Sequence, residues 1–192
     1  MVKRSNAVRR PQGSVRIIAG EWRARRITIP EDTSVRPTPD RVRETLFNWL
    51  RDVLDGARVL DLCAGTGALG FEALSRRAAE AWFVEQDPTL FAALGAQATT
   101  FGVRPRVLRQ DAAAFLRGTP VTSFEIVFLD PPYALPVEPL LALLPPWLAP
   151  AALIYVERPR DPGLPAIDGA EWVKRSHAGA VEYGLLRFSA AV

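Results

Sequence analysis

The sequence has very few of the residues that build disulfides and metal centres. Among its 192 residues there is one cysteine, Cys63, and one histidine, His177. A single cysteine excludes an internal disulfide and any metal site with several cysteine ligands. A single histidine argues against a zinc centre. We therefore expect no metal.

Long apolar runs are missing as well. The best candidate for a membrane span, residues 140–153, is interrupted by Pro145, Pro146 and Pro150. No apolar run with a cleavage site follows the basic amino terminus, so no secretory signal is visible. With 48% hydrophobic and 23% charged residues, the composition is typical of a soluble globular protein. We expect one main domain in the cytoplasm and, because no helix shows a surplus apolar face, a monomer.

Acidic residues are scarce in the amino-terminal segment. Residues 1–26 contain eight lysines and arginines but one acid, Glu21, so their net charge is +7. The whole chain has a net charge of +3. The remainder of the chain therefore carries −4. A basic arm on an acidic body indicates a polyanionic partner, with nucleic acid the leading candidate. For residues 1–12 alone, a flexible tail that only aids solubility is an equal alternative.

Residues 13–35 have the pattern of a β-hairpin. Two β-rich runs, 15–20 and 25–30, are joined by the short link 21–24, and Gly20 can form the bend. A tryptophan among arginines suits the stacking and charge of unpaired RNA bases. Burial of the tryptophan in the core is the alternative. The candidate RNA-binding residues are Arg16, Trp22, Arg23, Arg25 and Arg26.

The rest of the chain alternates strands and helices. This alternation predicts an α/β fold with a mostly parallel sheet. Two strand-like runs at the end, 171–176 and 181–188, predict a terminal hairpin that inserts an antiparallel strand. Before the first parallel strand we expect a helix over 40–54, capped by Thr38 or Asp40. The parallel strands are expected at 57–62, 81–84, 106–109, 124–129 and 152–156. Helices are expected from the end of the loop 64–70 to about 77, at 88–100, at 112–116 and around 140–144.

A glycine-rich turn follows the first of these strands. Gly65, Gly67 and Gly70 have the G-x-G-x-x-G spacing that lets a cofactor approach the backbone closely. A pyrophosphate would be repelled by Asp61 just upstream, so a cofactor with a positive centre fits better. Asp61 could instead only order the loop. Glu85, at the end of the next strand, is placed to bind a ribose diol.

Asp111 follows the third strand. It could accept a hydrogen bond from an adenine amine, and it could also cap the helix over 112–116. These two roles are compatible.

The fourth strand ends in Asp130-Pro131-Pro132-Tyr133. The prolines remove two backbone donors, so the carbonyls of the turn and the Asp130 carboxylate form an acceptor-rich pocket. Tyr133 adds a flat ring. The implied ligand is a planar group with N–H donors, such as the exocyclic amine of a nucleobase stacked on Tyr133.

These motifs together resemble a known family. The glycine turn, Glu85, Asp111 and the Asp130–Tyr133 turn are similar to S-adenosylmethionine-dependent amino-methyltransferases. Segment 36–48, together with 16–20 and 67–76, narrows the likeness to the RsmD family, the bacterial 16S ribosomal RNA guanine-N2 methyltransferases. The resemblance runs from about Arg16 to the terminal hairpin.

The resemblance implies a Rossmann-like class I methyltransferase domain over 36–192 with a seven-stranded sheet. It implies methylation of guanine 966 of 16S RNA, within a small-subunit particle, and a catalytic turn made of Asp130, Pro131, Pro132 and Tyr133. It assigns S-adenosylmethionine to a set of residues along the carboxyl edge of the sheet. They are Arg36, Thr38, Asp61, Ala64, Gly65, Gly67, Glu85, Gln86, Asp111, Ala112 and Asp130.

Three other functions remain open at this point. A nucleotide-dependent dehydrogenase shares the glycine turn but gives no reason for the Asp130 turn. A non-catalytic RNA-binding module shares the basic arm. An adenine-N6 methyltransferase uses much the same turn, and the four residues of the turn do not name the base.

Overall fold

The computed structural model describes residues 13–31, 33 and 38–189. The predicted tail 1–12 and the predicted cofactor residue Arg36 lie outside this part. Within it, no helix is both long and apolar enough to cross a membrane.

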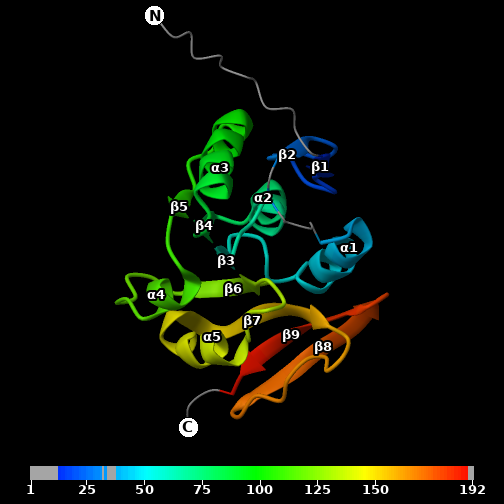
Figure 1. Ribbon diagram of the computed structural model, residues 1–192, viewed down its shortest axis with the longest axis vertical. Helices are drawn as coiled ribbons and strands as arrows, with labels where there is room; N and C mark the ends of the chain where they lie inside the picture. The colour runs from blue at the N-terminus through cyan, green and yellow to red at the C-terminus, as the bar shows by residue number, and fades with distance from the viewer. Residues whose placement is uncertain (1–12, 32, 34–37, 190–192) are drawn as a thin grey trace, which may run out of the picture.

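The described chain forms a two-stranded sheet and then alternating strands and helices (Figure 1). The strands are β1 (Gly13–Arg16), β2 (Arg26–Ile29), β3 (Arg58–Leu62), β4 (Glu80–Val84), β5 (Arg106–Leu108), β6 (Phe124–Leu129), β7 (Leu148–Pro159), β8 (Ala170–Ala178) and β9 (Val181–Phe188). The helices are α1 (Asp40–Trp49), α2 (Ala68–Ser75), α3 (Pro88–Phe101), α4 (Ala112–Leu116), α5 (Glu138–Leu143) and a 3₁₀ turn (Pro145–Trp147).

The main sheet has seven strands in the order β5-β4-β3-β6-β7-β9-β8. The first five are parallel, and β9 runs antiparallel between β7 and β8. The order reverses at β3, so the carboxyl ends of β3, β4 and β6 surround the point where ligands bind in open α/β sheets. The predicted fold class is confirmed, including the inserted antiparallel strand.

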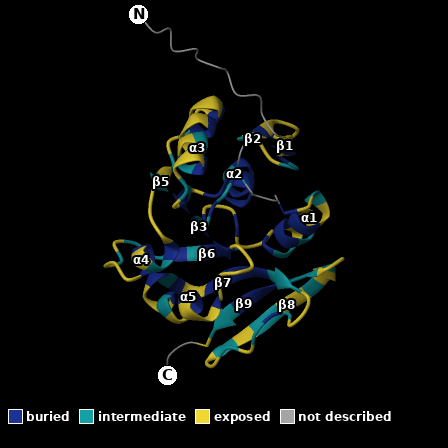
Figure 2. Cartoon of the chain, viewed as in Figure 1, coloured by how far each residue is buried: buried dark blue, intermediate teal, exposed yellow. Residues whose placement is uncertain are grey.

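Apolar side chains form one core on each face of the sheet (Figure 2). The hairpin, α1, α2 and α3 cover one face, where Phe47 of α1 packs edge-on against Phe128 of β6 with ring centroids 5.9 Å apart. Helices α4 and α5 and the 3₁₀ turn cover the other. The near-continuous apolar run of β6 is the sequence signature of a strand buried on both faces.

The amino-terminal hairpin is docked on α2 rather than standing apart. The buried carboxylate of Glu72 accepts hydrogen bonds from the Ile18 and Ala19 amides at 2.7 and 3.0 Å. Ser75 accepts from the Trp22 amide at 2.9 Å through its hydroxyl. These bonds satisfy backbone donors that no third strand reaches, so the link 17–25 is held by side chains of α2.

Helix α1 differs from the prediction at both ends. Neither Thr38 nor Asp40 caps it, because the cap residue is Pro39 and it makes no side-chain cap bond. Asp40 instead accepts a hydrogen bond from the guanidinium of Arg43 at 2.6 Å, and the Thr38 hydroxyl donates to Asp130. The helix ends at Trp49, five residues early, and Val53, which we expected on its core face, is 46% exposed. The last expected turn is a run of tight turns that leads the chain into β3.

Candidate active site

Four acidic residues gather at the carboxyl edge of the parallel strands. Asp61 is in β3, Glu85 follows β4, Asp111 comes shortly after β5 and Asp130 follows β6. Because these strands are parallel, their carboxyl ends lie at one edge. The sequence placed each acid at a strand end, and the register brings them to this edge.

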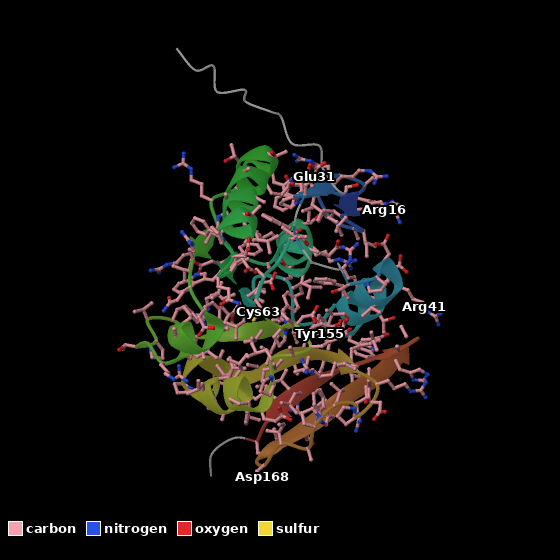
Figure 3. The ribbon with its side chains drawn as sticks, viewed as in Figure 1. Arg16, Glu31, Arg41, Cys63, Tyr155 and Asp168 are labelled. Atoms are coloured by element: carbon pink, nitrogen blue, oxygen red, sulfur yellow. The ribbon has the colours of Figure 1, made fainter. Side chains whose placement is uncertain are left out.

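Cys63 lies among these four acids, a position that the sequence analysis did not predict. Burial, together with the negative charges of Glu85, Asp61, Asp130 and Asp111, raises the pKa of its thiol to about 12. Cys63 is half-buried and directly follows β3, near the middle of the view in Figure 3. The backbone of Cys63 is left-handed, with φ of 70°, so the chain turns sharply out of the strand here. The carboxylates therefore face a common space around the first residue of the turn.

Asp61 is buried and its carboxylate accepts a hydrogen bond from the Gly70 amide at 2.9 Å. Burial raises the pKa of Asp61 to about 8, against the lowering effect of the Gly70 bond, and the Glu85 charge contributes to the rise. Asp61 therefore does order the glycine-rich turn, through its bond to the Gly70 amide. A positive ligand group near Asp61 would relieve the cost of its burial, so the loop-ordering and binding roles are compatible.

Glu85 shapes the same turn from the neighbouring strand. One carboxylate oxygen accepts from the Gly65 amide and the other from the Asp87 amide, both at 2.8 Å. Gly65 and Gly67 have positive φ angles of 56° and 75°, which glycine adopts at little cost. The glycine turn is therefore held open by Glu85 and by its own backbone conformation.

The remaining predicted cofactor residues line the outer part of this edge. Asp111 caps α4 by accepting from the Ala114 amide at 2.9 Å, and it is exposed, so its second oxygen is available to a ligand. Gln86 is also exposed, whereas Ala64 and Ala112 are buried, with 8% and 6% of their surfaces exposed. The small alanines leave room for a ligand beside the backbone.

Asp130 connects the sheet edge with the start of α1. The Thr38 hydroxyl donates to its carboxylate at 3.3 Å, across 92 residues of sequence. Burial and the neighbouring Glu157 charge hold the pKa of Asp130 well above its usual range, while the Thr38 bond and Arg158 oppose this shift. A carboxyl in this setting gains from any ligand that offers it N–H donors.

The two carbonyls of the proline turn are not equivalent. The Pro132 carbonyl accepts from the Leu135 amide at 2.8 Å and closes a turn. No hydrogen bond reaches the Pro131 carbonyl from the described residues. The predicted acceptor set is therefore reduced to Asp130 and the Pro131 carbonyl.

Tyr133 presents its ring at the surface, with 49% of the residue exposed. The guanidinium of Arg158 lies 5.7 Å from the ring centroid and donates to the carbonyls of Tyr133 and Leu135 at 2.7 and 3.1 Å. Arg158 thus clamps the turn from β7. No sequence pattern predicted this role of Arg158, because it binds backbone carbonyls, which every residue carries.

A buried carboxylate beside Asp130 was also missed. Leu129 pairs with Val156 in the parallel ladder, so the next residues, Asp130 and Glu157, stand side by side. Glu157 is 5% exposed and accepts from the Tyr155 hydroxyl at 2.7 Å. Like Asp130, Glu157 directly follows a predicted parallel strand, here 152–156. Ligands bind at the carboxyl ends of such strands, so the sequence position of Glu157 could have identified it.

The predicted stacking role of Trp22 is wrong. The tryptophan is 5% exposed, and its ring stacks on Phe101 of α3 with centroids 4.6 Å apart. The arginines around it remain at the surface, where Arg25 lies over Phe101 and donates to the Thr100 carbonyl at 2.5 Å. The hairpin therefore offers charge without an exposed tryptophan.

A groove of about 500 Å³ runs between the hairpin and the start of α1. Arg16 and Arg26 line it from the hairpin, and Thr38 and Asp40 line it from the other side. Arg16 also donates to Asp40 at 3.2 Å. Thr38, which lines this groove, also donates to Asp130, so the groove lies next to the acidic edge.

The strand order, the glycine turn and the acids at successive strand ends define a class. They are those of a Rossmann-like methyltransferase. Comparison with known proteins narrows this class. The model of a family described as conserved hypothetical protein 95 matches residues 15–187.

Several curated relatives carry the name Ribosomal RNA small subunit methyltransferase D. The relative from Escherichia coli K12 is 45% identical over 181 residues, 90% of this chain and 89% of the relative. The relative from Haemophilus influenzae is 40% identical over 91% of this chain and 94% of its own length. The solved structure of yhhF from Escherichia coli superposes with a TM-score of 0.85 at 41% identity and covers 93% of this chain and 100% of that one. The chain belongs to this family of ribosomal RNA small subunit methyltransferases D, the RsmD family.

Proposed function

We propose that this protein transfers a methyl group from S-adenosylmethionine to the exocyclic N2 amine of guanine 966 in 16S ribosomal RNA. One observation carries the proposal. Two hydrogen-bond acceptors, the Asp130 carboxylate and a Pro131 carbonyl that receives no hydrogen bond from the described residues, lie next to each other at the carboxyl edge of the sheet. The family supports an RNA substrate, since its curated members are named as ribosomal RNA methyltransferases.

The residues at this edge fit the proposed cofactor. The buried Asp61 carboxylate suits its ammonium group, and the exposed oxygen of Asp111 suits its adenine amine. Glu85 suits the ribose, because it retains acceptor capacity while holding the Gly65 amide. When bound, S-adenosylmethionine supplies a methyl group activated by a positive sulfur.

The chain's own contribution is to hold the guanine amine. The lone pair of this amine is delocalised into the purine ring, so the amine is a poor nucleophile. Asp130 and the Pro131 carbonyl can accept its two protons, which localises the lone pair and fixes its direction. The same acceptors stabilise the positive charge that develops on the nitrogen.

Asp130 has no need to act as a base before transfer. A carboxylate remains far too weak to deprotonate a neutral aryl amine, even with a raised pKa. Once the nitrogen has four bonds it is acidic, and Asp130 is the acceptor already in contact with it. The raised pKa of Asp130 favours this late proton uptake.

The target base must leave its stack to reach this edge. Tyr133, exposed and clamped by Arg158, offers a face on which the extruded base can stack. The arginines of the hairpin and the groove next to Thr38 provide a positive path for the RNA backbone. This path ends beside Asp130.

Transfer of labelled methyl to 16S RNA and to assembled small-subunit particles tests the proposal. Mass mapping of the modified nucleoside should show N2-methylguanine at position 966. N6-methyladenine would instead assign the turn to the other base, and binding without transfer would indicate a non-catalytic RNA module. Calorimetric titration with S-adenosylhomocysteine and with NAD tests the cofactor, and binding of NAD alone would refute it.

A further inference from the structure

A second carboxylate stands next to Asp130 in the proposed base pocket. The last paired residues of β6 and β7 are Leu129 and Val156, so Asp130 and Glu157 are the next neighbours across the ladder. Side chains alternate along a strand, and both acids therefore project to the face that α1 covers, where Phe128 and Tyr155 lie two residues earlier. Neighbouring strands are about 4.8 Å apart, so the two carboxyl groups can reach adjacent atoms of one ligand.

Glu157 is held in place by a hydrogen bond and is buried without a positively charged partner in the described part of the chain. The Tyr155 hydroxyl donates to one carboxylate oxygen at 2.7 Å, and Glu157 is 5% exposed. No salt bridge to Glu157 is found among the described residues. Arg158, the next residue, points to the Tyr133 turn instead. A buried, unpaired acid is costly and marks a functional site more often than a structural one.

Two adjacent buried carboxylates suit a ligand with two adjacent donors. Burial and the Glu157 charge both raise the pKa of Asp130, and burial also raises the pKa of Glu157. Guanine carries such donors, because its ring N1–H lies next to the N2 amine on one edge. Adenine has a lone pair at N1 next to its amine, and this lone pair would face a carboxylate.

We propose that Glu157 accepts a hydrogen bond from N1–H of the target guanine and selects guanine over bases that have an amine next to an unprotonated ring nitrogen. This inference rests on the proposed N2 methylation. It assigns to Glu157 the choice of base that the Asp130–Tyr133 turn leaves open. Asp130 binds the reacting amine, and Glu157 reads the neighbouring atom.

A single-base replacement in the RNA tests the assignment. 2-Aminopurine keeps the 2-amine of guanine but has a lone pair at N1. With 2-aminopurine at the target position, single-turnover methyl transfer by the unaltered protein should be about 100-fold slower than with guanine. In Glu157→Gln the amide can donate to the N1 lone pair. This variant should transfer methyl to guanine more slowly. The ratio of the guanine rate to the 2-aminopurine rate should fall to less than about 10.

Two further variants keep the test decisive. Glu171→Gln removes an exposed acid on the edge strand β8 and should leave both rates unchanged. Tyr155→Phe retains the Glu157 carboxylate but removes the hydroxyl that holds it, so the ratio should fall several-fold even if Glu157→Gln fails to fold. Affinity for S-adenosylhomocysteine should be unchanged in all three.

If Glu157→Gln slows both substrates by the same factor and leaves the ratio as it was, Glu157 only supports the turn and the inference is wrong. A protein that makes no N2-methylguanine at all refutes the proposed function first. A protein that makes it with no preference over 2-aminopurine refutes the inference alone.

Discussion

At the scale of single residues, Asp61 carries a cost that a ligand would relieve. Its folded pKa of about 8 lies above the ordinary aspartate value of 3.8, so between these values the folded protein binds a proton that the unfolded chain has lost. Stability therefore falls as pH rises through this window. Asp61→Asn removes the ionisation, and its amide oxygen can still accept from Gly70. We expect the variant to be more stable than the unaltered protein at pH 8 by at least about 1 kcal/mol.

Urea unfolding at pH 5 and pH 8 checks this expectation. The stability advantage of Asp61→Asn should grow with pH, since only the unaltered protein ionises at this position. Affinity for S-adenosylhomocysteine should fall in the same variant because the ammonium loses its counter-charge. A constant advantage at both pH values would show that the Asp61 carboxyl does not titrate in this range.

Asp130 should affect chemistry and leave cofactor binding intact. Asp130→Ala removes one of two acceptors for the amine and should lower methyl transfer by about 10²–10³-fold or more. Cofactor affinity should change little, because the proposed ribose, adenine and ammonium contacts come from other strands. Single-turnover transfer and calorimetry separate the two effects, with the exposed Asp168→Ala as control. A parallel loss of both would place Asp130 in the cofactor site alone.

At the scale of elements, the hairpin depends on close contact between Gly20 and α2. Gly20 has φ of 84°, and a Cβ there would lie 1.8 Å from the Ser75 carbonyl oxygen. Gly56 has a similar φ of 74° but open space around it. Alanine at 56 should cost about 1 kcal/mol for the backbone alone, whereas alanine at 20 should cost about 3 kcal/mol or more. Urea unfolding of the two variants measures the difference, and equal costs would contradict the docking.

The fold was more accessible from the sequence than the details of the site. Short apolar runs rich in β-branched and aromatic residues, such as 124–129, predict buried strands, and an acid after each of them predicts one functional edge. Trp22 and the cap of α1 depend on partners far along the chain. Phe101 covers the tryptophan ring, and Asp130 takes the Thr38 hydroxyl. The local sequence pattern carries no information about such distant partners. For this reason Trp22 was predicted to stack on RNA although it is buried in the folded protein.

At the scale of the whole molecule, charge is divided between the amino-terminal segment 1–26 and the rest of the chain. Residues 1–26 carry +7 and the remainder −4. Each phosphate contact made by an arginine releases counterions and adds about 0.7–0.9 to the slope of log affinity against log salt. Changing Arg23, Arg25 and Arg26 together to alanine should therefore weaken RNA binding and reduce this slope by up to about 2–3. Binding to 16S RNA at several salt concentrations measures both quantities.

The control for this prediction removes the same charge elsewhere. Arg104, Arg106 and Arg117 are exposed, and the first two lie at the amino end of β5, opposite the acidic edge. Alanine at these three positions lowers the net charge equally but should leave the salt slope within about half a unit of its original value. S-adenosylhomocysteine affinity should be the same in both triple variants. If both slopes fall alike, RNA binding follows total charge rather than the hairpin, and the proposed path from the hairpin to Asp130 loses its support.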